Sequence, residues 1–167
     1  MLRISRLADY GVVLATRLAL LEEGQLRSVR TLAEDTGIPQ PTVSKILKAL
    51  GRSLVVTSIR GAHGGYRLAR APEDTSVAEV IVALEGPIGV TECVRDDEEP
   101  GCDLQGRCEV HGNWNRINEV LDRALRDISL AEMAQPAPPV LITLGLGRPS
   151  TPPSDGRLQA AGSHESR

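Results

Sequence analysis

Residues 29–70 place two short helical patterns directly before a glycine-rich hairpin, an order that few folds accommodate. The first pattern, VRTLAEDTG, follows Ser28 and stops at Gly37; the second, QPTVSKILKAL, follows Ile38-Pro39. Next comes LVVTSI, which is rich in β-branched residues, then the turn RGAHGG and the returning strand YRLAR. Two helices joined by a tight turn and followed at once by a hairpin predict a winged helix-turn-helix domain.

Helical spacing of the apolar residues predicts an aliphatic core, because the chain has one Trp, two Tyr and no Phe. A first helix is expected over residues 5–23 with Ser5 as its cap, and a further helix is expected to begin at Thr75 or Ser76. The side chains expected to face inward in the first three helices are Leu7, Leu14, Leu18, Leu21, Val29, Leu32, Ala33, Val43, Ile46, Leu47 and Leu50.

The polar face of the second helix and the hairpin turn form a candidate DNA-binding surface. Residues 1–71 carry eleven Lys/Arg against five Asp/Glu, a net charge of +6, whereas residues 72–167 carry a net charge of −9. A basic half of this kind indicates a polyanionic partner, although a solvated surface has the same composition. Such a helix enters the major groove of double-stranded DNA, and the wing reaches the backbone or the minor groove. The candidate contacts are Thr42, Ser44, Lys45, Lys48, Arg60, Gly61 and His63.

All three cysteines lie in CVRDDEEPGCDLQGRCEVH, with the spacing C-x8-C-x5-C-x2-H. Three thiolates and an imidazole can complete a four-coordinate site for a soft or borderline metal. The gaps are wider than in most zinc sites and favour a larger ligand such as an iron–sulfur cluster. Two other interpretations stay open, a reversible disulfide and buried cysteines without a ligand. The candidate ligands are Cys93, Cys102, Cys108 and His111.

A long helix is expected over residues 112–135, where apolar residues recur every three or four positions and form a seam suited to a homodimer. Packing of this helix on its own domain is the alternative. Residues 136–167 hold six of the eleven prolines and are expected to form a flexible tail. We expect neither a signal peptide nor a membrane segment, and therefore a cytoplasmic location. The seam residues are Trp114, Ile117, Leu121, Ala124 and Ile128.

No phosphate loop, dinucleotide fingerprint or nucleophile–base pair is evident, so we do not expect an enzyme. The sequence predicts a mainly α protein with a small β-hairpin, a winged helix-turn-helix domain followed by a long dimerisation helix. Its expected divisions are a DNA-binding domain at 1–86, a cluster-binding loop at 87–111, the dimerisation helix at 112–135 and the tail at 136–167.

From residue 2 to about 135, the chain resembles the iron–sulfur-dependent winged-helix transcription regulators, the family of IscR and NsrR. The segments that carry the resemblance are RISRLADYGVVL, TLAEDTGI, PTVSKILKAL, RGAHGGYRLAR, VAEVIVALEG and the cysteine segment, in the family's order. RGAHGGYRLAR together with LEGPIGVTEC is most similar to regulators of the SUF cluster-assembly operon. Leu54 departs from the family, whose members usually have a glycine before the first wing strand.

The resemblance implies a repressor that senses an iron–sulfur cluster and binds promoter operators as a homodimer. It assigns Cys93, Cys102 and Cys108 to the cluster and His111 to its fourth ligand in the [2Fe–2S] branch, which we favour. Asp9 matches the alternative fourth ligand of the [4Fe–4S] branch, contributed by the partner subunit. A nitric-oxide- or redox-sensing repressor and a zinc or thiol-switch repressor are the alternatives.

Overall fold

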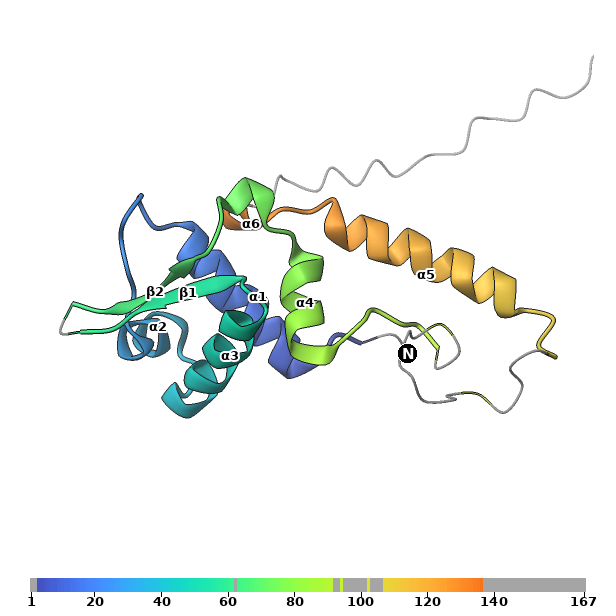
Figure 1. Ribbon diagram of the computed structural model, residues 1–167, viewed down its shortest axis with the longest axis horizontal. Helices are drawn as coiled ribbons and strands as arrows, with labels where there is room; N and C mark the ends of the chain where they lie inside the picture. The colour runs from blue at the N-terminus through green and yellow to red at the C-terminus, as the bar shows by residue number, and fades with distance from the viewer. Residues whose placement is uncertain (1–2, 62, 92–93, 95–101, 103–106, 137–167) are drawn as a thin grey trace, which may run out of the picture. The chain divides into compact units, whose positions relative to one another are not determined.

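A computed structural model describes residues 3–61, 63–91, 94, 102 and 107–136 of the chain (Figure 1). Within these residues the fold is mainly helical with one two-stranded antiparallel sheet, as the sequence predicts. None of the helices described is long and apolar enough to cross a membrane. In chain order the elements are α1 (Arg6–Ala19), α2 (Val29–Thr36), α3 (Gln40–Arg52), β1 (Val56–Ile59), β2 (Gly65–Leu68), a 3-10 turn η1 (Pro72–Asp74), α4 (Val77–Glu85), α5 (His111–Arg126) and α6 (Leu130–Ala134).

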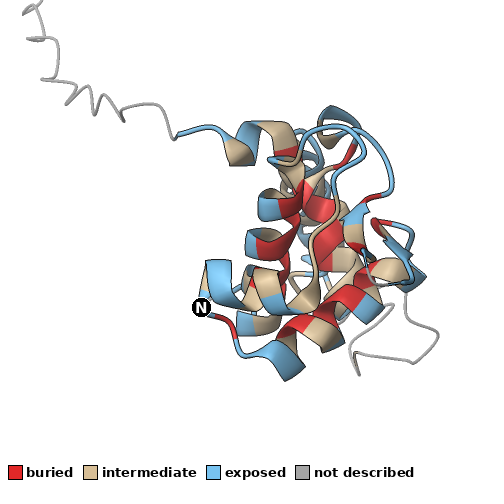
Figure 2. Ribbon diagram, turned by 90° about the vertical axis from the view of Figure 1, so that its left-hand side faces the viewer, coloured by how far each residue is buried: buried red, intermediate tan, exposed pale blue. Residues whose placement is uncertain are grey.

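The main core is an aliphatic cluster to which α1, α2, α3, the hairpin, α4 and α6 contribute (Figure 2). All eleven side chains expected to face inward belong to it, either as buried members or as half-buried groups packed against its edge. The hydrophobic effect therefore stabilises the helix-turn-helix and the wing as one unit. The fully buried members include Leu14, Leu32, Val43, Ile46, Leu47, Leu50, Val80 and Leu130.

The helix boundaries follow capping residues visible in the sequence. Ser5 accepts hydrogen bonds from the backbone N–H groups of Leu7 and Ala8, which confirms it as the cap of α1. That helix ends at Ala19, four residues before the expected limit. Gly37 ends α2 in the left-handed region with φ of 70°, a conformation that costs glycine little.

The wing is anchored to the rest of the domain through a backbone pairing that the sequence did not predict. The Arg27 N–H donates to the Tyr66 carbonyl at 3.0 Å, and the Tyr66 N–H donates to the Arg27 carbonyl at 2.8 Å. Gly65 lies buried beside this pairing, where an added Cβ would be 2.7 Å from the Arg27 carbonyl oxygen. Gly65 is therefore needed for a close backbone approach, and not only for the hairpin turn in which the sequence places it.

Leu54, at the exit from α3, is the one described non-glycine residue with positive φ (56°), and its side chain is 74% exposed. Since left-handed backbone costs a residue with a Cβ about 1–2 kcal/mol, we expect Leu54→Gly to stabilise the protein by about 1 kcal/mol after the entropy cost of glycine. Urea unfolding measures the gain. Ser53→Gly, at a neighbouring position with φ of −89°, is the control and should be destabilising.

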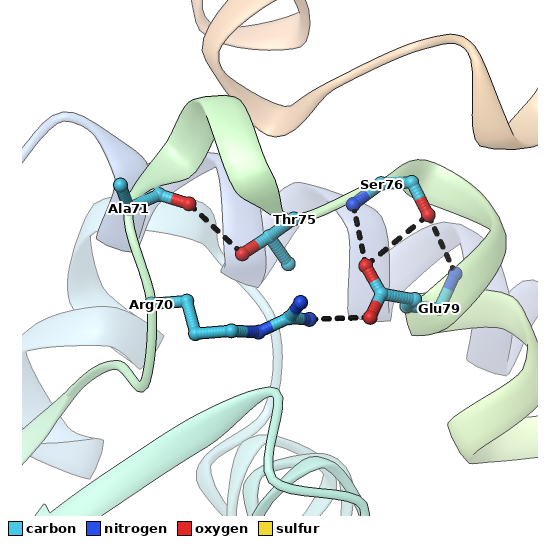
Figure 3. A network of polar contacts seen from close by, with 5 residues as sticks. All are labelled: Arg70, Ala71, Thr75, Ser76 and Glu79. Atoms are coloured by element: carbon cyan, nitrogen blue, oxygen red, sulfur yellow. Dashed lines mark hydrogen bonds and ion pairs between the residues drawn. The ribbon is translucent and has the colours of Figure 1, made fainter.

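Figure 3 shows how the segment after the wing is joined to α4. The Arg70 guanidinium pairs with the Glu79 carboxylate, which also accepts the Ser76 N–H at 2.8 Å in a capping box. Burial opposes ionisation of Glu79, but the hydrogen bond from Ser76 and the charge of Arg70 outweigh it and lower the pKa of Glu79. Thr75, the residue before Ser76, is buried and donates to the Ala71 carbonyl at 3.0 Å.

A lowered carboxyl pKa in the folded state contributes stability above the unfolded pKa, and that contribution is lost as pH falls through the folded pKa. We therefore expect Glu79→Gln to cost about 0.5–1 kcal/mol at pH 7, a small figure because Arg70 is half exposed. The difference from wild type should shrink below pH 4.5, the ordinary pKa of Glu. Urea unfolding between pH 7 and pH 3 measures it, with the exposed Glu85→Gln as control; a difference that is constant with pH would contradict the assignment.

The range 112–135, expected as one helix, is two helices with different surroundings. The break falls at 127–129, where Ser129 forms a capping box with Glu132 at the start of α6. Two backbone hydrogen bonds, Val77 N–H to the Ile128 carbonyl at 2.9 Å and Leu130 N–H to the Thr75 carbonyl at 2.8 Å, tie this break to the start of α4. Leu130 is fully buried in the core, so α6 belongs to the winged-helix domain.

Candidate functional site

The first candidate surface is the solvent-facing side of α3. Four side chains of α3 are fully buried, which fixes the orientation of the helix on the core. On the opposite side, Lys45 and Lys48 are exposed, whereas Thr42 and Ser44 are half-buried. The helix therefore presents two ammonium groups and two hydroxyl groups together, which suits contacts to phosphates and base edges.

Sequence reasoning missed two further polar residues of this surface. Gln40 and Arg52, the first and last residues of α3, are both exposed. Pro39 precedes the helix and provides no side-chain cap, so the start of α3 is unobstructed by a capping side chain. The signal was present in the sequence, since Gln40 precedes Ser44 by four positions and lies near it on the helix surface.

The second element of the surface is the wing. Strands β1 and β2 pair antiparallel from Val56 opposite Leu68 to Ile59 opposite Gly65. The loop that joins them carries Arg60, Gly61 and His63, and all three are exposed. Gly61 has φ of 126°, and an added Cβ would meet nothing within 4 Å, so the backbone conformation alone calls for glycine there.

Cys102 and Cys108 are free thiols, and both are half-buried. His111 follows as the first residue of α5, with its N–H donating to the Cys108 carbonyl at 3.3 Å. Cys93 lies outside the described residues. Within the described part of the chain, no three Cys, His, Asp or Glu side chains converge to hold a metal ion, so the predicted ligand set is not brought together there.

The imidazole of His111 has one nitrogen engaged and one free. Its Nε2 lies 3.3 Å from the side-chain nitrogen of Asn115, one helical turn further along α5. Its Nδ1 is buried and has no hydrogen-bond partner among the described residues. A buried nitrogen left in this way normally costs stability unless something else pairs with it.

A second asparagine of α5 holds the chain that leads into the cysteine segment. The Asn118 side-chain oxygen accepts the Val90 N–H at 3.2 Å. The cysteine segment thus starts three residues after a contact with α5 and ends where α5 begins. Asp9, the alternative ligand, is exposed on α1.

α5 is amphipathic, yet none of its residues is fully buried. Leu125 packs with Ala8, Val77 and Ile81 of the same chain, which agrees with partial packing on its own domain. Several large apolar residues remain exposed on or near the helix: Val110, Trp114, Ile117, Val120 and Ile128.

A helix-turn-helix with an exposed polar helix, followed by an anchored two-stranded wing, defines a winged-helix DNA-binding transcription regulator. Residues 4–136 match the model of the Rrf2 family, described as "Iron-dependent Transcriptional regulator". The chain belongs to the Rrf2 family, which confirms the resemblance to the regulators that include IscR and NsrR. The matching proteins are transcription regulators rather than enzymes, which agrees with the expectation from sequence.

Three relatives illustrate the breadth of the match. The chain is 27% identical over 132 residues to "HTH-type transcriptional regulator NsrR" of Halalkalibacterium halodurans, covering 79% of this chain and 90% of that protein. The structure of CymR, the global cysteine regulator of B. subtilis, is 30% identical with a TM-score of 0.63 and covers 80% of this chain and 97% of that one. The structure of T. potens IscR is 29% identical with a TM-score of 0.60, covering 79% and 85%.

Proposed function

We propose that this protein is a cytoplasmic, homodimeric repressor whose affinity for promoter DNA depends on an iron–sulfur cluster. The observation that carries the proposal is the combination, in one member of an iron-dependent regulator family, of a polar, exposed face on α3 with free thiols at Cys102 and Cys108 shortly before His111. Cys93, Cys102, Cys108 and His111 are the proposed ligands. The winged helix supplies DNA binding, and the cysteine segment supplies the signal.

The donor set fits a cluster chemically. Cys102 and Cys108 are not paired in a disulfide, and a thiolate or a neutral imidazole such as that of His111 can bind a metal. When bound, an iron–sulfur cluster supplies sensitivity to oxidants, iron supply and nitric oxide. We favour [2Fe–2S] with His111 as fourth ligand. Asp9 of the partner subunit is the alternative, which belongs to a [4Fe–4S] site.

The proposed dimer places the exposed apolar side of α5 against a second copy of the chain. Trp114, Ile117 and Val120 are between 37% and 60% exposed, which is unusual for large apolar groups on a helix this amphipathic. Two-fold pairing would bury them and set the distance between the two recognition helices, and this distance must match the operator half-sites. Occupancy of the cysteine segment at the start of α5 would then alter DNA affinity.

The genes of SUF-type cluster assembly are the proposed target, on the basis of the wing and LEGPIGVTEC segments. Sensing of nitric oxide or redox state is the alternative suggested by NsrR. A zinc or thiol-switch repressor is favoured instead if the thiols hold no iron. The likeness to CymR, a cysteine regulator, supports this second candidate.

Anaerobic purification followed by visible absorption and by iron, sulfide and zinc analysis tests the proposal. We expect a brown protein with iron and acid-labile sulfide in a fixed ratio, and Mössbauer spectra then separate [2Fe–2S] from [4Fe–4S]. A colourless protein that takes up no iron after reconstitution would replace the proposal with the zinc or thiol-switch repressor.

DNA binding has its own test in the wing. We expect Arg60→Ala to weaken operator binding by about 10–100-fold, because an arginine at the tip of the loop can enter the minor groove or neutralise a phosphate. Electrophoretic mobility shift at fixed salt measures the loss. Arg30→Ala is the matched control, since Arg30 is exposed but paired with Glu34 on α2. Equal affinity for wild type and Arg60→Ala would remove Arg60 from the interface, and an iron–sulfur carrier would predict no operator binding at all.

A further inference from the structure

We propose that Lys45 reads a guanine in each operator half-site, by donating to the O6 and N7 atoms that guanine presents in the major groove, whereas Lys48 and Arg52 contact the phosphate backbone. This inference rests on the proposed function, because it names the base that the DNA-binding surface recognises. It makes one of the two lysines of α3 a specificity-determining residue and the other a contact that carries no sequence information.

The outward side of α3 is a ridge of exposed residues that are four, three and four positions apart. At about 3.6 residues per turn this spacing keeps them on one face of the helix. That face is opposite the side chains of α3 that are buried in the core. The ridge is therefore the part of α3 that a groove of DNA would meet first. It consists of Pro41, Lys45, Lys48 and Arg52.

Lys45 is the first residue of this ridge that can donate a hydrogen bond to a base. Pro41, one turn earlier, has no polar side-chain atom. Lys45 lies in the first half of α3, and in a helix-turn-helix the first part of the recognition helix contacts base edges. Lys48 is roughly 4.5 Å and Arg52 roughly 10 Å further along the helix axis, so they are better placed for the backbone, because a straight helix leaves the curved groove.

The chemistry of the ridge limits which base it can recognise. An ammonium group only donates hydrogen bonds, and guanine is the base that presents two acceptors in the major groove. Adenine would place its own amino group against the ammonium, donor to donor. Recognition of cytosine usually needs a carboxylate to accept from its amino group, and α3 contains no Asp or Glu. Lys45 therefore favours guanine.

Lys45 is also free to make this contact. Within the described part of the chain, no ion pair or hydrogen bond involves its ammonium group. The exposed Arg30 of α2 is different, since it is paired with Glu34. Thr42 and Ser44 are half-buried and have shorter side chains. A base contact through Lys45 therefore breaks no existing interaction of the protein.

In vitro selection from random-sequence duplex DNA tests the inference, with full-length protein purified anaerobically and used before and after chelation of iron. Wild type should enrich half-sites that have a guanine at one fixed position. Lys45→Ala should lose the preference at that position and keep the others, whereas Lys45→Arg should retain it, because arginine also donates to O6 and N7. Lys48→Ala is the matched control. It should weaken binding to all sequences alike and lower the slope of log affinity against log salt by about 1.

Base substitution in the selected site then locates the contact. Exchange of the guanine for adenine should weaken wild-type binding by about 5–100-fold at fixed salt and Lys45→Ala binding by much less. 7-Deazaguanine, which lacks the N7 acceptor, should reproduce part of the wild-type loss and leave Lys45→Ala unaffected.

An unchanged selected sequence in Lys45→Ala would overturn the inference. So would equal sensitivity of wild type and Lys45→Ala to 7-deazaguanine, or a guanine preference that is lost in Lys48→Ala instead. Wild-type protein that enriches no sequence would overturn both this inference and the DNA-binding function. A guanine read by Lys45 in a protein whose affinity does not depend on iron would support this inference and reject only the cluster-dependent function.

Discussion

Gly65→Ala is expected to destabilise the protein by about 2 kcal/mol and to weaken operator binding at least tenfold, because the added methyl group overpacks a backbone contact. The new Cβ would lie 2.7 Å from the carbonyl oxygen and 2.8 Å from the carbonyl carbon of Arg27. Neither atom can turn away as the end of a side chain could. Relief requires the paired backbones of Arg27 and Tyr66 to separate.

Gly65→Ala should also weaken DNA binding, because Gly65 is the first residue of β2 and directly follows the loop that carries Arg60, Gly61 and His63. A displaced β2 moves that loop relative to α3, while the α3 side chains in the core stay in place. Operator affinity should therefore fall further than stability alone would predict. We expect Gly65→Ala to bind the operator more weakly than wild type even at temperatures where the variant is fully folded.

Urea unfolding and mobility shift on the same preparation measure the two effects. Gly112→Ala on α5 is the control, since an added Cβ there meets nothing within 4 Å and alanine favours a helix over glycine by about 1 kcal/mol. If Gly65→Ala had the same free energy of unfolding as wild type, the Arg27–Tyr66 pairing would not be needed to hold the wing.

Replacement of the thiols is the second large effect. We expect Cys93→Ala, Cys102→Ala and Cys108→Ala each to abolish cluster retention and to make operator affinity independent of iron, a change of about 5–150-fold relative to the loaded wild type. Each replacement removes one thiolate of the proposed site, and the chain has no cysteine beyond these three. Cluster loss should lower operator occupancy and relieve repression.

Anaerobic mobility shift, before and after chelation of iron, measures the coupling. Cluster-free wild-type protein is the matched control, because it has the intact sequence and should bind DNA like the variants. Circular dichroism checks that half-buried Cys102 and Cys108 can be replaced without unfolding. Full operator binding and regulation in all three variants would falsify the coupling, although the DNA-binding function would stand.

Local patterns predicted the winged-helix part well because each element carries its own signal. Helical spacing identified the buried faces of α1, α2 and α3, and Ser5 and Gly37 marked two helix ends through hydrogen bonding and backbone conformation that involve only neighbouring residues. The resemblance to a known family, which the comparisons confirm, rested on the same segments.

The helices over residues 111–134 were predicted less well. The apolar spacing of residues 114–128 continues past the break after Arg126, so it favoured one uninterrupted helix. The motif Ser129-x-x-Glu132 was a local signal for a new helix, equivalent to Ser76-x-x-Glu79, and it was overlooked. Leu130 is buried in the core against residues far away in the sequence, and no local pattern predicts such contacts.

Sequence by itself determined the class of this protein: the order of helices and hairpin, the faces that become the core and the polar face of α3. The tertiary structure alone decided which distant groups meet, namely Arg27 with Tyr66, Asn118 with Val90, and the start of α6 with the start of α4. The reason is physical. Capping and periodicity act between residues a few positions apart, whereas a hydrogen bond across 28 or more residues depends on how the whole core packs, and no short pattern records it.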